Sequence, residues 1–356
     1  MSEKMLAAVK TKPEAGFELV EVDIPKPGPD EVLIQVKAAS ICGTDKHILQ
    51  WDPWAQSRIK PPMIFGHECC GIVVETGKNV KRVRTGDYIS AETHIPCQHC
   101  FQCRTGNMHL CKNLVILGVD RDGVFAEYAT IPEICCWKNH PDLPLDIASV
   151  QEPLGNAVYT VMESNVGAKR IAIIGDGPTA NFACGVASVV GASLIYSLGM
   201  ADFNLNICKR MGADIAINVT KEKDYVKRII DETDGGVDVV LDMAGNKNAV
   251  SDGFAILRKT GTYTSFGISS TPFEFDMANN IVFKGAKVIG ISGRKMFETW
   301  YQIRNLLDYK QLNIAPAITH HFAFKDFGKA AETALSPEID SSKVVLMPFP
   351  VDENGQ

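Results

Sequence analysis

The chain has 356 residues, 46% hydrophobic and 22% charged, with 36 basic and 42 acidic side chains and a formal net charge of -6. This composition is typical of folded globular proteins and argues against a disordered, collagen-like or disulfide-dense chain. The length predicts two domains, and the acidic balance offers no electrostatic surface for nucleic acid. We therefore expect a small-molecule partner.

Alternating apolar and polar runs, broken by Gly and Pro, fill the chain up to about residue 155 and predict an antiparallel β domain with Cys-rich loops. From 156 to 292, strand patterns alternate with helical patterns, which predicts βαβ units in a doubly wound parallel sheet. The segment 293–356 begins with a helix from Met296 and continues with strand patterns at 318–324 and 341–349. We expect it to complete the first domain. The predicted fold class is α/β with a separate β-rich domain.

One uncharged stretch, Gly177 to Ala201, is long enough to suggest a membrane span. Its glycines and polar residues make it a poor hydrocarbon segment. We interpret it as a buried helix followed by a buried strand, with Gly191 at the break, and expect no membrane association.

Eleven cysteines are too few for a disulfide scaffold in a chain of this length. The first residues, MSEKMLAAVK, lack the pattern of a secretory leader, so we expect a cytoplasmic protein. The odd number also excludes complete pairing within one chain and leaves metal binding as an alternative.

Four of the cysteines form a C-x2-C-x2-C-x7-C pattern: Cys97, Cys100, Cys103 and Cys111. Short spacings let one loop wrap four thiolates around a tetrahedral ion, which favours a closed, structural zinc site. An iron–sulfur cluster is the chemical alternative, because it also uses closely spaced cysteines.

A second group of candidate ligands consists of Cys42, His67 and Glu68, with Glu152 as a further ligand that could complete or exchange with them. Three protein ligands and one open position suit a catalytic zinc ion, which acts as a Lewis acid. Spacing alone is a weak indication here, since any one of these residues is more often structural.

The sequence around His67 reads G-H-E-x2-G-x5-G-x2-V from Gly66 to Val80. It resembles the zinc signature of the medium-chain dehydrogenase/reductase family, and the resemblance covers essentially the whole chain. It implies a GroES-like zinc catalytic domain, 1–155 completed by 293–356, and a Rossmann domain at 156–292. It also implies an oxidoreductase that works as a homotetramer.

Longer phrases, among them SICGTDKHI, WDPWAQSRIKPPMIFGHE and GISGRKMFETWY, narrow the resemblance to the branch that oxidises L-threonine at its 3-hydroxyl with NAD. In that branch Cys42, His67 and Glu68 would hold the catalytic zinc, with Glu152 nearby. Thr44 and His47 would relay the proton, and His94 would lie on the substrate side.

A G-x-G-x-x-A motif runs from Gly175 to Ala180, between a predicted strand and a predicted helix. It indicates a dinucleotide loop in which Gly175 makes the turn and Gly177 lets the backbone approach the pyrophosphate. Asp176 is unfavourable beside a phosphate unless it points away. The resemblance adds further cofactor-lining positions: Thr179, Phe266, Gly267, Ile268, Ile291 and Ser292.

The next strand ends without the acid that normally accepts the ribose hydroxyls of NAD, since Gly199 stands there. The family's nearby arginine position holds Asn204, so a clamp for the 2′-phosphate of NADP is missing too. Asp202 could accept the ribose or simply cap a helix. We therefore expect only a modest preference for NAD, with NADP not excluded.

Fold and metal site do not fix the substrate. A dehydrogenase of a polyol or another secondary alcohol is one alternative, and a weakly active or noncatalytic zinc-binding homologue is another. The remaining cysteines, Cys69, Cys70, Cys135, Cys136, Cys184 and Cys208, are expected to be small buried side chains, with a redox switch as the alternative.

Overall fold

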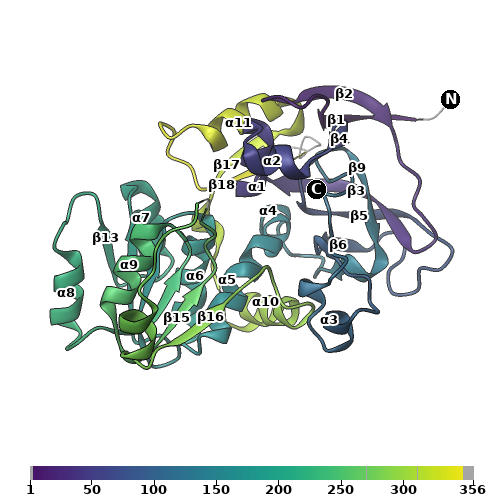
Figure 1. Cartoon of the computed structure of the whole chain (residues 1–356). Coiled ribbons are helices and arrows are strands. Elements are labelled where there is room, and N and C mark those ends of the chain that lie inside the picture. The colour runs from purple at the N-terminus through teal and green to yellow at the C-terminus, as the bar shows by residue number, and fades with distance from the viewer. Residues whose placement is uncertain (1–2, 270, 311, 348–356) are drawn as a thin grey trace. The chain divides into compact units, whose positions relative to one another are not determined.

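The computed structural model describes residues 3–269, 271–310 and 312–347. The chain forms two compact units, Met1–Pro153 with Ile318–Gln356, and Leu154–Ala317 (Figure 1). The segment 293–317, which we expected in the first domain, thus groups with the second unit. Its helix α10 (Glu298–Tyr309) buries Trp300 and Ile303, and a Cβ atom on Gly155 would lie 3.4 Å from the Ile303 side chain.

The first unit has a mainly antiparallel main sheet of order β10-β6-β5-β3-β18-β17, with β9 paired with β3 and a parallel pair between β17 and β18. Its strands are β3 (Glu31–Ser40), β5 (Glu68–Thr76), β6 (Tyr88–Ala91), β9 (Tyr128–Pro132), β10 (Cys136–Lys138), β17 (Ile318–Ala323) and β18 (Lys343–Met347). A smaller sheet contains β2 (Glu18–Asp23), β1 (Lys4–Lys10) and β4 (Met63–Ile64). Val345 of β18 pairs with Ser40 of β3, so the end of the described chain lies in the first unit's sheet. Residues 348–349 of the expected strand fall outside the described residues.

Short elements connect these strands, and the turns beside them carry Cys42, Cys97, Cys100 and Cys111. The short elements are α1 (Gly43–Gln50), α2 (Pro53–Arg58), β7 (His94–Ile95), α3 (Phe101–Arg104), β8 (Val115–Ile116), α4 (Leu145–Ser149) and α11 (Phe327–Leu335). The sequence did not lead us to expect α11. Its first residue, Phe327, is fully buried, with ring centroids 4.7 Å from Phe17 and 4.9 Å from Phe125. This aromatic cluster attaches α11 to the core of the first unit.

The second unit has the predicted alternation of strands and helices. Its elements are α5 (Gln151–Glu163, which begins in the first unit), β11 (Arg170–Ile174), α6 (Pro178–Val189), β12 (Leu194–Gly199), α7 (Asp202–Arg210), β13 (Ile215–Asn218), α8 (Tyr225–Glu232), β14 (Val237–Asp242), α9 (Lys247–Ile256), β15 (Leu257–Ser265), β16 (Lys287–Gly290) and α10. The strands are parallel, in the order β13-β12-β11-β14-β15-β16. This is the doubly wound order of a Rossmann fold.

The uncharged stretch from Gly177 to Ala201 forms α6 and β12, and Gly191 between them has a φ of +88°. A non-glycine residue would be strained in that conformation. Among the described residues, the helices are all too short or too polar to cross a membrane.

Replacing Phe327 by Ala is expected to open a cavity in the aromatic cluster and to cost about 3–5 kcal/mol of unfolding free energy. Urea unfolding of the full-length protein measures this loss. Phe101 is 76% exposed in the same unit, so its replacement by Ala should cost under about 0.5 kcal/mol. Equal losses in the two variants would contradict the core position of α11.

Candidate functional site

Three candidate metal ligands come together where β3 and β5 pair. Ser40 of β3 lies opposite Glu68 of β5, so Cys42, two residues after Ser40, is brought beside Glu68. One donor atom from each of Cys42, His67 and Glu68 lies within 4.8 Å of the others. Asp45 fixes the turn into α1, since its carboxylate accepts a 2.8 Å hydrogen bond from the Cys42 N–H.

Glu68 is fully buried, and its two oxygens have different surroundings. Oε2 accepts hydrogen bonds from the Ser40 hydroxyl and the buried Lys343 ammonium, and Lys343 also donates to the Ile41 carbonyl at 3.1 Å. Oε1 is buried without a hydrogen-bond partner. A buried carboxylate oxygen without a donor is costly, so the free oxygen beside Cys42 and His67 fits a bound cation.

The charge distribution also fits a cation. Burial raises the pKa of Asp45 to about 6. Burial lowers the pKa of His67, but Asp45, 3.7 Å from its Nδ1, and the Cys42 thiol outweigh that effect and raise the pKa to about 10. Asp45, Cys42 and Glu152 thus surround His67, while Lys46 and Lys343 interact with the same Cys42. A divalent metal with soft and nitrogen ligands is compatible with this set of donors.

Glu152 lies close to this group but outside the set whose donor atoms are within 4.8 Å of one another. Its Oε1 accepts a 3.0 Å hydrogen bond from the Thr93 hydroxyl, and its charge contributes to the raised pKa of His67. This position suits a nearby ligand better than a permanent one.

The candidate proton-relay residues lie on α1. Thr44 Oγ1 is 4.0 Å from the Cys42 sulfur, while the exposed His47 holds Nδ1 2.6 Å from the Asp52 carboxylate. Within the described residues, Thr44 and His47 form no hydrogen bond with each other. The structure thus places Thr44 at the ligand group and His47 at the surface.

His94, the candidate substrate-side residue, is half-buried on β7. Its Nδ1 lies 3.2 Å from the fully buried Glu92 carboxylate, which also accepts a hydrogen bond from the His94 N–H at 2.9 Å. Glu92 therefore fixes both the backbone and the ring of His94.

Sequence reasoning missed Asp45, Glu92 and Lys343. Asp45 could have been found, because an acid three residues into a helix commonly bonds the backbone at its start. Lys343 carried no such signal, since it lies 275 residues from Glu68 along the chain.

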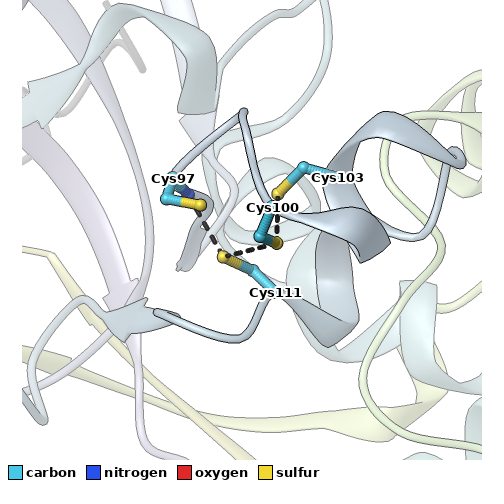
Figure 2. A group of neighbouring side chains, drawn as sticks. All are labelled: Cys97, Cys100, Cys103 and Cys111. Atoms are coloured by element: carbon cyan, nitrogen blue, oxygen red, sulfur yellow. Dashed lines mark hydrogen bonds between the residues drawn. The ribbon is translucent and has the colours of Figure 1, made fainter.

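The cysteine loop between β7 and β8 gathers Cys97, Cys100, Cys103 and Cys111 (Figure 2). The Cys100 sulfur lies 3.5 Å from that of Cys103 and 3.8 Å from that of Cys111. Backbone N–H groups of Cys103 and Lys112 lower the pKa of the Cys100 thiol to about 6, which favours the thiolate. These are the properties of a metal-binding loop.

The sulfur spacing distinguishes between the chemical alternatives. A Zn–S bond of about 2.3 Å places neighbouring sulfurs of a tetrahedron about 3.8 Å apart. In an iron–sulfur cubane each cysteine binds a different iron, which holds the thiolates further apart. The loop therefore fits one tetrahedral ion.

The candidate dinucleotide positions gather at the carboxyl ends of the parallel strands, the edge where Rossmann folds bind their ligands. Gly175, with a φ of +117°, follows β11, and Gly177 is the N-cap of α6, with open space where a side chain would stand. Thr179 lies in the first turn of α6, Gly199 ends β12, Phe266 to Ile268 follow β15, and Ile291 and Ser292 follow β16. Ile268 is 91% exposed, and Ile291 is buried.

Asn204 and Asp202 follow β12. The side-chain oxygen of Asn204 is buried without a hydrogen-bond partner among the described residues, and its backbone carbonyl accepts a 3.2 Å hydrogen bond from Asn181 of α6. Asp202 pairs with Lys221 and accepts a 2.6 Å hydrogen bond from Asn218. Ala201 occupies the capping position of α7, so the expected capping role of Asp202 is not observed.

The remaining cysteines are buried side chains. They are Cys69, Cys70, Cys135, Cys136, Cys184 and Cys208. Burial raises the pKa of Cys70 to about 12, which keeps this thiol protonated and unreactive.

Comparisons with known proteins agree with this geometry. Residues 28–142 match the alcohol dehydrogenase GroES-like domain, and residues 178–308 match the zinc-binding dehydrogenase domain. L-threonine 3-dehydrogenase of Pyrococcus furiosus is 47% identical, and that of Bacillus subtilis 44%; each alignment covers 98% of this chain and 99% of the relative.

Solved structures share the architecture. An alcohol dehydrogenase of Thermotoga maritima superposes with a TM-score of 0.88 at 25% identity, covering 98% of this chain and all of that one. A zinc-binding dehydrogenase of Sinorhizobium meliloti bound to NADP has a TM-score of 0.88 at 27% identity, with 98% and 100% covered. The chain therefore belongs to the zinc-containing alcohol dehydrogenases of the medium-chain dehydrogenase/reductase family, in the branch of the L-threonine 3-dehydrogenases.

Proposed function

We propose that this protein oxidises L-threonine at its 3-hydroxyl to 2-amino-3-oxobutanoate, with NAD as the hydride acceptor. The buried group of Cys42, His67 and Glu68 carries the proposal, because it offers the donors of a catalytic zinc site in a chain closely similar to L-threonine 3-dehydrogenases. No observation favours a polyol dehydrogenase or a noncatalytic homologue. A turnover assay with L-threonine, sorbitol and butanediol tests the proposal, and preferred oxidation of either alcohol over threonine would refute it.

Cys42, His67 and Glu68 would hold the catalytic zinc, with Glu152 as a nearby or exchanging ligand. When bound, zinc supplies a Lewis acid that makes the substrate hydroxyl more acidic, and NAD supplies the acceptor for the hydride from C3. Lys343 and Ser40 orient Glu68, while Asp45 interacts electrostatically with His67 across 3.7 Å. Cys97, Cys100, Cys103 and Cys111 would hold a structural zinc, whose closed coordination leaves no position for chemistry.

The released proton needs a path to solvent. The Thr44 hydroxyl can accept and donate at one oxygen beside the ligand group, and the exposed His47 ring can pass the proton outward while Asp52 holds its Nδ1. His94, fixed by Glu92, would orient the substrate. The resemblance also supports a cytoplasmic homotetramer.

Replacing Cys42 by Ser is expected to lower kcat by more than about 100-fold and to reduce bound zinc, because a soft thiolate ligand is lost. Turnover and elemental analysis measure both effects. The matched control is Cys70→Ser, since Cys70 already donates to the Leu145 carbonyl at 3.3 Å and a hydroxyl can do the same. Normal turnover with full metal content in the Cys42 variant would contradict the catalytic assignment.

Replacing Cys103 by Ala is expected to remove one zinc per chain and to lower the Tm, with little loss of kcat per folded protein. Cys136→Ala, a change at a buried cysteine outside the loop, should retain all the zinc. Iron in place of zinc in the wild-type loop would refute the structural zinc site.

Replacing His47 by Gln is expected to lower kcat about 10-fold or more, since a positioned acid–base group is lost. Added imidazole buffer should restore part of the rate, because it can carry the proton from the surface. A rate that falls without rescue would argue against a proton-transfer role.

A further inference from the structure

The end of β12 carries Gly199 in place of an acidic residue. The carboxylate of Asp176 occupies the space that the side chain of such an acid would take. A Cβ atom built on Gly199 would lie 2.5 Å from the Cβ of Asp176, 2.6 Å from its Oδ2 and 2.7 Å from its Cγ. These distances are far inside van der Waals contact. The Asp176 carboxylate therefore fills the position that a side chain at 199 would take.

Asp176 is held there by the backbone that follows β12. Its Oδ2 accepts hydrogen bonds from the N–H groups of Met200 and Ala201, each at 2.7 Å. The carboxylate thus points toward β12 and away from Gly177, the residue that begins α6. An acid in the glycine-rich loop is compatible with a pyrophosphate at that helix in this orientation, since it does not face the phosphate.

The second oxygen of Asp176 remains available. Within the described part of the chain, Oδ1 accepts no hydrogen bond. Asp176, Gly199 and Met200 line a pocket of about 520 Å³ in the second unit, together with residues that follow β13 and β14, among them Thr220, Lys223 and Asn246. This volume is within the range of small-molecule sites.

We propose that Asp176 is the carboxylate that binds the adenosine ribose of NAD, replacing the acid that Rossmann folds normally carry at the end of the second strand. Gly199 has no side chain and so leaves space for the Asp176 carboxylate. The acid thus stands at 176 and the small residue at 199, and we call these two residues an exchanged pair. Oδ1 accepts from the ribose hydroxyls, and the negative charge disfavours the 2′-phosphate of NADP. Asp176 is therefore the residue that selects NAD, and the preference is stronger than Gly199 alone suggests.

Lys223 is the cation that lines this pocket, and its ammonium donates to the Val219 carbonyl at 3.4 Å. Asp202, the other acid near the end of β12, is paired with Lys221 and Asn218. Asp252 is the other acid that lines the pocket, and it accepts a hydrogen bond from the Tyr225 hydroxyl. Asp176 is thus the acid of this pocket whose carboxylate is fixed at the end of β12.

The inference rests on the proposed use of a nicotinamide dinucleotide but not on the identity of the substrate. Calorimetric titration of the zinc-loaded protein with NADH and with NADPH tests it without turnover. The wild type should bind NADH about 10-fold or more tightly than NADPH. Asp176→Asn keeps an oxygen for the Met200 and Ala201 N–H groups but loses the charge, so it should weaken NADH binding about 10- to 100-fold and bring the two affinities close together.

An exchange experiment tests the pairing itself. Gly199→Asp alone should weaken NADH binding, because the new side chain overlaps Asp176. Combining it with Asp176→Ala returns the acid to the strand end and should restore tight binding of NADH over NADPH. Thermal melting of each variant shows whether it is folded. A folded double variant that binds NADH no better than Gly199→Asp would overturn the inference.

The remaining outcomes separate this inference from the proposed function. If Asp176→Asn leaves both affinities unchanged, or if Asp202→Asn shifts the preference instead, Asp176 is not the selecting residue while the dehydrogenase assignment stands. If the wild type binds neither dinucleotide, the proposed function fails and the inference with it.

Discussion

The buried charge of Glu68 is the constraint on which the organisation of the first unit depends. An uncompensated carboxylate in a protein interior is destabilising by about 3–5 kcal/mol. The compensating ammonium comes from Lys343, at the start of the last described strand, and β3 holds that strand in register beside Glu68. The candidate site therefore depends on residues from β5 and from the last described strand, which both pair with β3 in one sheet.

The Lys343–Glu68 ion pair leaves one oxygen of Glu68 without a partner. Cys42, Asp45 and Glu152 bring additional acceptor groups, and His67, Lys343 and Lys46 are cations that interact with them. The free oxygen of Glu68 faces this set without a donor. Metal binding and folding are coupled wherever ligands gather in this way, so a zinc ion held by Cys42, His67 and Glu68 would stabilise this part of the interior. The cysteine loop achieves the same result locally, within fifteen residues.

The sequence predicted what depends on local pattern. The alternation of strand and helix patterns was enough to predict a parallel, doubly wound sheet in the second unit, and the spacing of Cys97 to Cys111 was enough to predict the cysteine loop. Cys42 and His67 could be assigned to one metal site only through the family resemblance. The pairing of β3 with β5 brings them together, and spacing along the chain does not show that pairing. The Lys343–Glu68 contact and the packing of α10 with the second unit depend on tertiary structure. Residue patterns could not reveal either of them.

The dinucleotide loop shows how position-by-position comparison can mislead. In the sequence, Gly199 stands where Rossmann folds that bind NAD normally have an acid, which suggests an impaired cofactor site. In three dimensions, the carboxyl ends of β11 and β12 are adjacent, since Gly175 donates its N–H to the Leu198 carbonyl at 2.8 Å. An acid placed one residue after Gly175 can therefore reach the point where an acid at 199 would start. A bound ribose would interact with the carboxylate at its position in space, whichever strand supplies it. With Asp176 at this position, Gly199 alone does not indicate an impaired cofactor site.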